Sequence, residues 1–240
     1  MLLSRVPRGE HRLLTMTWVK ICAITNLYDG RASVASGANA LGFIFAPSTR
    51  RSEVRTAAEI IAALPAGIEK IGVFVNETPE HVAEISLQVG LTGCQLHGAE
   101  PATELPKYRR VLGSCKLIKT LQASELLAKG GDPQLQAYLD MAGSIDAILL
   151  DSGVPGNLGG TGVPFDWERA LPIVQGIKAV LPVIIAGGLT AGNVGQAIRL
   201  FEPWGVDVVS GVERETGRKD EGKLRSFVAA VQAVHTVARA

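Results

Sequence analysis

A single closed (β/α)8 barrel, the TIM barrel, is the fold class that this sequence predicts, and three observations support it. Short apolar runs alternate with helical patterns eight times along the chain, the order expected of a parallel sheet covered by helices. The length of 240 residues suits one such barrel better than two small domains. The last two runs end in small residues, as strands seven and eight of barrels do where they bind phosphate. The alternative is an open, doubly wound sheet, because a sequence does not show closure.

The first half of the chain predicts four strand and helix pairs. The first strand ends at Cys22, and Thr25-Asn26 begins the helix that follows. Thr78-Pro79 is a second helix start, because threonine caps the free N–H groups and proline suits the first turn. The predicted strands cover residues 18–22, 40–45, 71–75 and 93–97, and the predicted helices cover 26–36, 56–64, 78–89 and 102–110.

The second half predicts four more pairs. Residues 122–142 have a helical pattern that Gly130-Gly131-Asp132-Pro133 interrupts, and residues 152–162 are rich in glycine, which predicts a mobile loop. Apolar residues at 224, 227, 228 and 231 have the i, i+3, i+4, i+7 spacing of a final helix that packs on the barrel. The predicted strands cover 116–120, 147–151, 183–186 and 206–209, and further helices are predicted at 167–180 and 193–200.

Composition favours a small-molecule partner. The formal net charge of +1 and the pI near 7.7 give no electrostatic reason to expect nucleic acid or an anionic membrane surface. Three scattered cysteines, Cys22, Cys94 and Cys115, are too few for a disulfide framework or a cysteine-based zinc site. We therefore expect a reducing, cytoplasmic location, no metal and no cofactor.

The N-terminus predicts a tail. Residues 1–16 mix charged and apolar side chains without the apolar core of a signal peptide, and no run in the chain is long enough to span a bilayer. We expect residues 1–16 to lie outside a barrel domain of residues 17–240. Met16 stands directly before the first strand and is an alternative start to Met1.

Polar residues at the carboxyl ends of the strands are the candidates for chemistry, because active sites of barrels lie there. Lys20 and Cys22 share one face of the first strand, since side chains alternate. A cation beside a thiol is expected to lower its pKa and make the thiolate a usable general base. Asp151 ends an apolar run and could serve as a general acid. The other candidates at strand ends are His97, Asp207 and the pair Arg50-Arg51.

Each candidate also has a structural explanation. A lone cysteine is often a small core residue, and Asp151 before Ser152-Gly153 could cap a turn. Asp207 could form a salt bridge with Lys20, and exposed arginines before a helix are often only solvated. His97, on the face that Gln95 shares, could be a hydrogen-bonded core histidine.

Eight segments together resemble one family, phosphoribosylanthranilate isomerase of tryptophan biosynthesis. The similarity covers about residues 17 to 229, and it is specific because of the number, order and spacing of the segments. They are Val19-Lys20-Ile21-Cys22-Ala23-Ile24-Thr25-Asn26, Ala40-Leu41-Gly42-Phe43-Ile44-Phe45, Gly72-Val73-Phe74-Val75-Asn76, Gln95-Leu96-His97-Gly98, Leu149-Leu150-Asp151-Ser152, Gly159-Gly160-Thr161-Gly162 with Phe165-Asp166-Trp167, Ala186-Gly187-Gly188-Leu189, and Gly205-Val206-Asp207 with Ser210-Gly211-Val212-Glu213.

The resemblance implies a (β/α)8 barrel without a cofactor that catalyses the Amadori rearrangement of N-(5'-phosphoribosyl)anthranilate, a phosphosugar. Cys22 matches the family's general base and Asp151 its general acid. Arg50, or alternatively Arg51, matches the arginine that holds the anthranilate carboxylate. Asp207 matches the carboxylate near the anthranilate amine. The phosphate site matches Gly187, Gly188, Ser210 and Gly211, and Lys20 and His97 complete the expected substrate-binding residues.

The chain departs from the family's pattern at two positions. Ala23 stands where the family usually has glycine, so the backbone there is expected to avoid positive φ. Val209 replaces a frequent serine. Two other functions stay open: another phosphosugar isomerase, such as the related histidine-pathway enzyme that uses two aspartates, or a non-catalytic subunit that binds a phosphometabolite. We expect a monomer or a homodimer.

Overall fold

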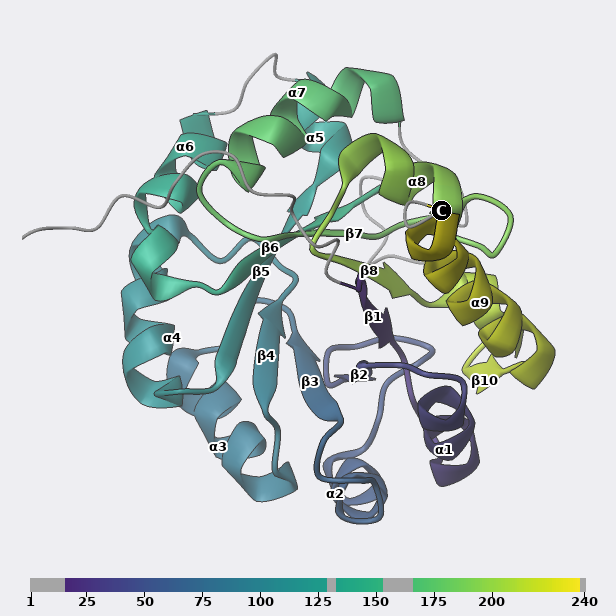
Figure 1. Ribbon diagram of the computed structural model, residues 1–240. Helices are drawn as coiled ribbons and strands as arrows, with labels where there is room; N and C mark the ends of the chain where they lie inside the picture. The colour runs from purple at the N-terminus through teal and green to yellow at the C-terminus, as the bar shows by residue number, and fades with distance from the viewer. Residues whose placement is uncertain (1–15, 129–132, 153–165, 238–240) are drawn as a thin grey trace, which may run out of the picture.

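The computed structural model describes residues 16–128, 133–152 and 166–237, and it forms a closed parallel barrel. Each strand pairs with the next in sequence, and the first pairs with the last, so the barrel is predicted correctly and the open sheet is wrong. Figure 1 shows the helices around the strands, with the first and last parts of the barrel side by side. The strands are β1 Trp18–Ile21, β2 Ala40–Ile44, β3 Glu69–Phe74, β4 Gly93–Leu96, β5 Lys116–Gln122, β6 Ala147–Asp151, β7 Val183–Ile185 and β8 Gly205–Val208.

The helices agree with the sequence prediction to within a few residues at most ends. The side chain of Asn26 accepts from the N–H of Asp29 at 2.9 Å, and Thr78 accepts from the N–H of His81 at 3.2 Å, as their capping roles predict. The helices are α1 Leu27–Ala35, α2 Val54–Ala62, α3 Pro79–Val89, α4 Leu105–Leu112, α5 Ala123–Ala128, α6 Pro133–Asp140, α7 Trp167–Lys178, α8 Val194–Phe201 and α9 Glu221–Val237. None of the helices in the described ranges is long and apolar enough to cross a membrane.

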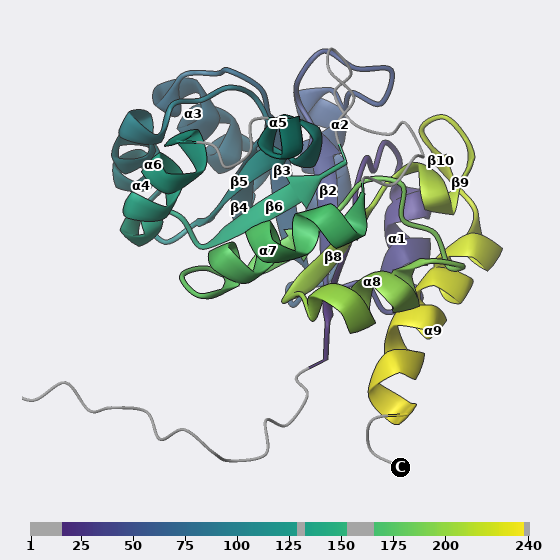
Figure 2. The ribbon, with the colours of Figure 1, turned by 90° about the horizontal axis from the view of Figure 1, so that it is seen from above.

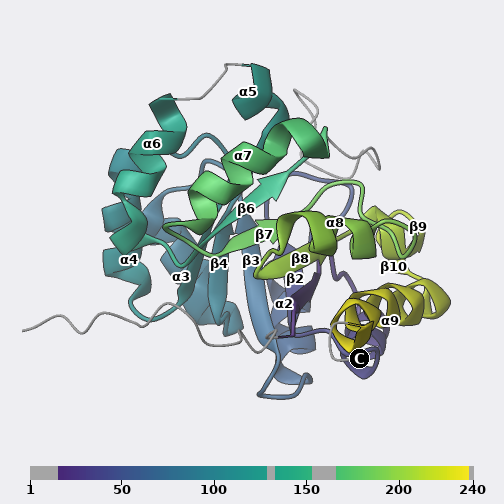
Figure 3. The ribbon, with the colours of Figure 1, turned by 45° about the horizontal axis from the view of Figure 1, so that its top comes forward.

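Three details go beyond the prediction or fall outside the described residues. The turn before α4 is a 3-10 helix, Ala102–Glu104, rather than the start of one continuous α-helix. A short hairpin, β9 Glu213–Glu215 with β10 Arg218–Lys219, precedes α9 and was not predicted; Figures 2 and 3 show it beside α9. The predicted tail up to residue 15, residues 129–132 and the glycine-rich segment from residue 153 lie outside the described residues.

Side-chain alternation divides each strand between two cores. One cluster fills the inside of the barrel, and a larger one lies between the strands and the surrounding helices. The register of β1 on β8 pairs Lys20 with Asp207, so both side chains enter the barrel at the same level. The inner cluster consists of Trp18, Ala40, Ile71, Ile118, Ala147, Leu149, Ile184 and Ala186.

An aromatic and ionic layer closes the amino-terminal end of the barrel. The rings of Trp18 and Trp204 stack with centroids 4.9 Å apart, and the Lys116 ammonium lies 4.8 Å from the centroid of Trp204. Glu69 accepts from that ammonium at 2.7 Å. These four residues, which we call the barrel floor, combine ring stacking, cation–π attraction and an ion pair where the strands begin.

A buried ion pair fixes the loop that follows β4. The ammonium of Lys119 lies 2.8 Å from Oε2 of Glu100, with side chains 1% and 2% exposed. Oε1 of Glu100 accepts from the N–H groups of Asn76 at 2.8 Å and Gly98 at 3.1 Å. The hydroxyl of Tyr138 donates to the Glu100 carbonyl at 2.7 Å. The loop is therefore tied to β3, β5 and α6 at once.

The backbone at Ala23 contradicts the sequence-based expectation. Its φ is +64°, in the left-handed region that the absence of glycine was expected to exclude. Ala23 is also buried, at the turn between Cys22 and α1. A Cβ in this region is close to the backbone carbonyl, so the conformation costs about 1 kcal/mol and is held by the surrounding structure.

Replacing Ala23 with glycine should therefore raise the free energy of unfolding by about 1 kcal/mol, because glycine adopts positive φ without this strain. Urea unfolding of both proteins measures the change through the midpoint at constant slope. As a control, Ala58→Gly in the ordinary helix α2 should lower stability by about 1 kcal/mol. Equal losses for the two variants would contradict the strain at Ala23.

Candidate active site

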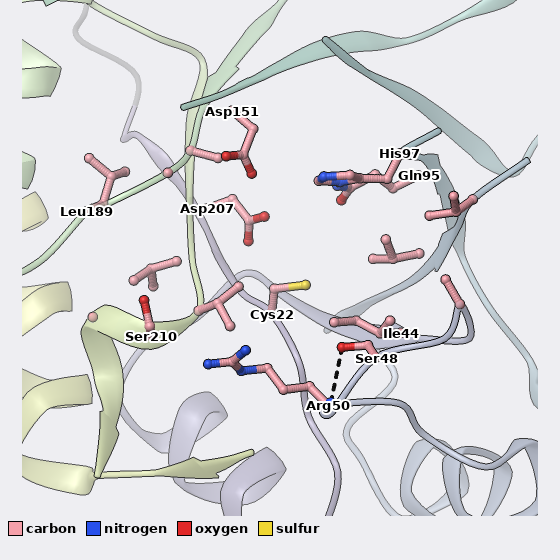
Figure 4. A pocket seen from close by; sticks show the side chains of 18 of the residues that line it. Cys22, Ile44, Ser48, Arg50, Gln95, His97, Asp151, Leu189, Asp207 and Ser210 are labelled. Carbon is pink, nitrogen blue, oxygen red and sulfur yellow. Dashed lines mark hydrogen bonds between the residues drawn. The ribbon is translucent and has the colours of Figure 1, made fainter. Parts of the chain in front are cut away.

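A cavity opens at the carboxyl ends of the strands, and residues from all but one of the barrel strands or the loops after them line it. Figure 4 shows Asp151 and Asp207 on one side, Gln95 and His97 on the other, and Cys22 between them. Most of the predicted site residues meet here. Those that line the cavity are Cys22, Arg50, His97, Asp151, Gly187, Gly188, Asp207, Ser210 and Gly211.

Cys22 is placed in the cavity by the residue beside it on β2. A Cβ at Gly42 would overlap the Cys22 sulfur, so only glycine at this position leaves room for the thiol. Burial raises the pKa of the Cys22 thiol, and the neighbouring Lys20 lowers it by less. The prediction that Lys20 makes the pKa low overall is wrong, because the thiol is almost completely removed from water and the Asp207 carboxylate also disfavours the thiolate.

Lys20 lies one step deeper in the barrel and pairs with Asp207. Its ammonium is 2.8 Å from Oδ2 of Asp207, with side chains 0% and 7% exposed. Burial lowers the pKa of Lys20, but the attraction to Asp207 and Cys22 raises it by a larger amount. The pKa of Lys20 is therefore raised overall. The salt bridge considered from the sequence is present. Among the described residues Oδ1 of Asp207 has no hydrogen-bond partner, and Asp207 lines the cavity.

Asp151 is the last residue of β6 and is 7% exposed. The hydroxyl of Ser152 donates to its Oδ1 at 3.3 Å. Gly187, at the end of β7, leaves the space that Ser152 occupies, because a Cβ at Gly187 would overlap the serine. Asp151 is therefore held at the end of β6, where it lines the cavity.

The loops after β7 and β8 form one end of the cavity. Gly187 and Gly188 have φ of +85° and +65°, which glycine adopts readily. A Cβ at Gly211 would overlap the carbonyl of Leu189, so the two loops touch because residue 211 is glycine. Ser210 begins a 3-10 turn, Ser210–Val212, at the same place. Glycine-rich backbone at this end of a barrel is typical of phosphate sites.

Arg50 lines the cavity, whereas Arg51 is exposed and its backbone pairs with Ile44. Two nitrogens of Arg50 hold the carboxylate of Glu213: Nε lies 2.9 Å from Oε1, and Nη2 lies 2.8 Å from Oε2. Burial raises the pKa of Glu213, but Arg50 and Lys219 outweigh it and lower the pKa. No role had been assigned to Glu213. A carboxylate two residues after Gly211, in the segment that follows β8, was a signal, since a buried charge needs a partner.

His97 and its neighbour Gln95 form the opposite wall. Nε2 of Gln95 lies 3.0 Å from Nδ1 of His97 and 3.1 Å from Oγ1 of Thr120. Burial lowers the pKa of His97, while the charge of Asp151 raises it by less. Gln95 was not among the predicted site residues, although its place on the same face as His97 pointed to it.

Among the residues that the structure describes, no group of three or more metal-ligating side chains could hold a metal ion. The charged groups instead are spread around the cavity. A thiol and a carboxyl group approach it from β1 and β6, a guanidinium lies near its β2 side, and glycine-rich backbone forms its β7 and β8 side. Such an arrangement can move protons on a substrate that carries negative charge at both ends.

Comparison with known proteins identifies the family of this chain. The model of the N-(5'phosphoribosyl)anthranilate (PRA) isomerase family matches residues 19–230. An N-(5'-phosphoribosyl)anthranilate isomerase of Desulforudis audaxviator is 42% identical over 213 residues, which cover 89% of this chain and 97% of the relative. The crystal structure of the Thermotoga maritima isomerase superposes with a TM-score of 0.78 at 35% identity and covers 91% of this chain and 100% of that one.

A further similar crystal structure holds a ligand. It is a phosphoribosylanthranilate isomerase in complex with reduced 1-(o-carboxyphenylamino)-1-deoxyribulose 5-phosphate, with a TM-score of 0.75 and 33% identity over 91% of this chain and 100% of that one. The family model covers most of the chain, and the relatives match at nearly full length. The chain therefore belongs to the phosphoribosylanthranilate isomerase family and is an isomerase of tryptophan biosynthesis.

Proposed function

We propose that Cys22 is the base and Asp151 the acid with which this isomerase converts N-(5'-phosphoribosyl)anthranilate into 1-(2-carboxyphenylamino)-1-deoxyribulose 5-phosphate. The observation that carries the proposal is the position of these two side chains on separate strands, β1 and β6, around one cavity. An Amadori rearrangement needs an acid and a base on different sides of the sugar. The ligand in the similar crystal structure is a reduced form of the same product.

The reaction begins with opening of the sugar ring. Protonated Asp151 donates its proton to the ring oxygen as the bond from C1 to that oxygen breaks, and the nitrogen lone pair forms a protonated Schiff base at C1. The Cys22 thiolate then removes the C2 proton, and the released electron pair forms the double bond between C1 and C2 of an enolamine. The carboxylate of Asp151 then takes the proton of the C2 hydroxyl, and the Cys22 thiol returns its proton to C1, which gives the ketose and restores the acid and the base. No atom is gained or lost.

The ends of the cavity suit the two ends of the substrate. The phosphate binds the backbone at Gly187, Gly188, Ser210 and Gly211, where no side chain blocks its approach. The anthranilate carboxylate binds Arg50, because Arg50 lines the cavity and Arg51 does not. Glu213 holds Nε and Nη2 of Arg50, so the guanidinium is oriented before the substrate arrives.

Asp207 orients the amine of the substrate. Lys20 fixes one carboxylate oxygen, Oδ2, at 2.8 Å, and the other oxygen, Oδ1, has no partner among the described residues. An N–H group of the substrate can donate to Oδ1 without breaking the pair with Lys20. Lys20 thus supports substrate binding from below, and His97 contributes from the β4 side of the cavity.

Three broader expectations also stay proposals. Residues 1–16 form a tail outside the barrel domain of residues 17–240, and the protein acts in the cytoplasm. It acts on its small-molecule substrate as a monomer or a homodimer. A similar Thermotoga maritima isomerase is described as dimeric. Light scattering of this purified protein distinguishes a monomer from a homodimer.

The direct test mixes the purified chain with freshly prepared phosphoribosylanthranilate and follows the loss of its anthranilate-type fluorescence. We expect a loss that depends on enzyme concentration and exceeds the spontaneous decay of the substrate. A rate equal to that of substrate alone would refute the proposed reaction.

The pH dependence of alkylation by iodoacetamide should report the thiol of Cys22. Because burial raises the pKa of Cys22, the thiolate fraction in the free enzyme is small near neutrality. We therefore expect the rate of alkylation at Cys22, obtained as the difference from the Cys22→Ala variant, to rise with pH beyond about pH 8.5, the ordinary cysteine pKa. Lys20 does not contribute to this rise because its pKa is raised as well, so it stays protonated. A rate that already reaches its plateau near neutral pH would contradict the raised pKa of Cys22.

A further inference from the structure

Gln95 on β4 and His97, the residue directly after β4, form a buried pair that faces the inside of the barrel. Gln95 is 1% exposed, and its amide nitrogen contacts both Nδ1 of His97 and Oγ1 of Thr120. Two polar atoms of the pair, Oε1 of Gln95 and Nε2 of His97, are buried without a partner among the described residues. Figure 4 shows both side chains facing the cavity from the side opposite Asp151 and Asp207.

The hydrogen bonds of the amide decide where the imidazole carries its proton. With its nitrogen toward His97 and Thr120, Gln95 donates one N–H to each and leaves one oxygen without a donor. In the reversed orientation the oxygen would accept from both residues, and two buried N–H groups would have no acceptor. Unpaired buried donors are rarer and more costly than an unpaired carbonyl. The observed orientation leaves one buried donor of the pair without a partner, Nε2–H of His97, against two amide N–H groups in the reversed orientation. Nδ1 of His97 therefore accepts, and the neutral ring carries its hydrogen on Nε2.

The surroundings keep this ring neutral. Burial lowers the pKa of His97 and outweighs the opposing attraction of Asp151 on β6. Lys20 on β1 and Asp207 on β8 act on the pKa of His97 in opposite directions and pair with each other. Lys119 on β5 lowers this pKa as well. A neutral imidazole with a bare Nδ1 and a protonated Nε2 is a directed hydrogen-bond donor.

We propose that Gln95 is a positioning residue, which fixes His97 in the Nε2–H form and directs that N–H into the cavity toward an oxygen of the substrate's sugar. The identity of the acceptor rests on the proposed function, whereas the proton position does not. Thr120 accepts the other N–H of the Gln95 amide, so turning the amide would leave both of its N–H groups without an acceptor.

Nitrogen-15 NMR of the labelled full chain tests the proton position directly. The His97 signals are identified by their loss in His97→Gln. We expect a protonated Nε2 and a bare Nδ1 in the unchanged protein. In Gln95→Glu the side chain can only accept, so the proton should appear on Nδ1. The matched control Thr120→Val removes the other contact of the amide and should leave the His97 pattern unchanged. A hydrogen on Nδ1 in the unchanged protein would overturn the proposal.

Kinetics tests whether Gln95 acts through His97. Gln95→Met keeps a similar shape without hydrogen bonds, and it should lower kcat/KM by about tenfold, as expected for one lost hydrogen bond. In His97→Gln an amide nitrogen takes the place of Nε2–H, so adding Gln95→Met there should cost less than about twofold. Equal losses in both backgrounds would show a merely structural role and overturn the proposal. A protein with the expected NMR pattern but no isomerase activity would instead refute the proposed function.

Discussion

Asp151→Asn and Cys22→Ala should each lower kcat by about two to four orders of magnitude, the usual contribution of a general acid or base. Asparagine can still accept from Ser152 but cannot serve as the acid, and alanine removes the sulfur without adding volume. Turnover is measured from the fluorescence decrease of the substrate. Thermal unfolding of each variant should stay close to that of the unchanged protein, because neither change removes a large buried side chain.

Cys94→Ala is the matched control for the Cys22→Ala variant. Cys94 is also buried, but it packs in the outer core between the barrel and the helices, away from the cavity. Its loss should leave kcat unchanged. If Cys22→Ala and Asp151→Asn kept full turnover, the assignment of acid and base would be wrong even though the family is established.

Glu100→Ala should lower the free energy of unfolding by about 3 to 5 kcal/mol, the range found when one partner of a buried ion pair is removed. The variant leaves the ammonium of Lys119 buried without its carboxylate, and it frees the N–H groups of Asn76 and Gly98. Urea unfolding gives the change in stability. The loop after β4 carries His97, so kcat/KM is expected to fall as well.

Glu104→Ala provides the comparison, because Glu104 pairs with Lys107 on the surface at 2.8 Å. Its side chain is 35% exposed and that of Lys107 is 53% exposed, so the pair is worth less than about 1 kcal/mol. If Glu100→Ala cost no more than Glu104→Ala, the ion pair of Lys119 would not hold the loop.

The sequence predicted the parts of this structure that depend on local pattern. Apolar runs placed all eight strands, capping residues placed the starts of α1 and α3, and side-chain alternation placed Lys20 with Cys22. The same alternation brought His97 and Gln95 to one face, although it did not show which atoms would meet.

Features that depend on distant contacts were missed. Arg50 and Glu213 are 163 positions apart, and their pairing follows from barrel closure rather than from either local sequence. The raised pKa of Cys22 depends on how deeply the thiol is buried, which residue spacing does not give. The positive φ of Ala23 is imposed by the turn between β1 and α1, against the preference of alanine.

The barrel floor of Trp18, Trp204, Lys116 and Glu69 determines at which end of the barrel small molecules can bind. In the described part of the chain, stacked indoles and a packed apolar interior fill the lower end, so reactant and product both bind in the cavity at the carboxyl ends of the strands. Because the product occupies the same cavity, it competes with the next reactant molecule, and we expect competitive product inhibition.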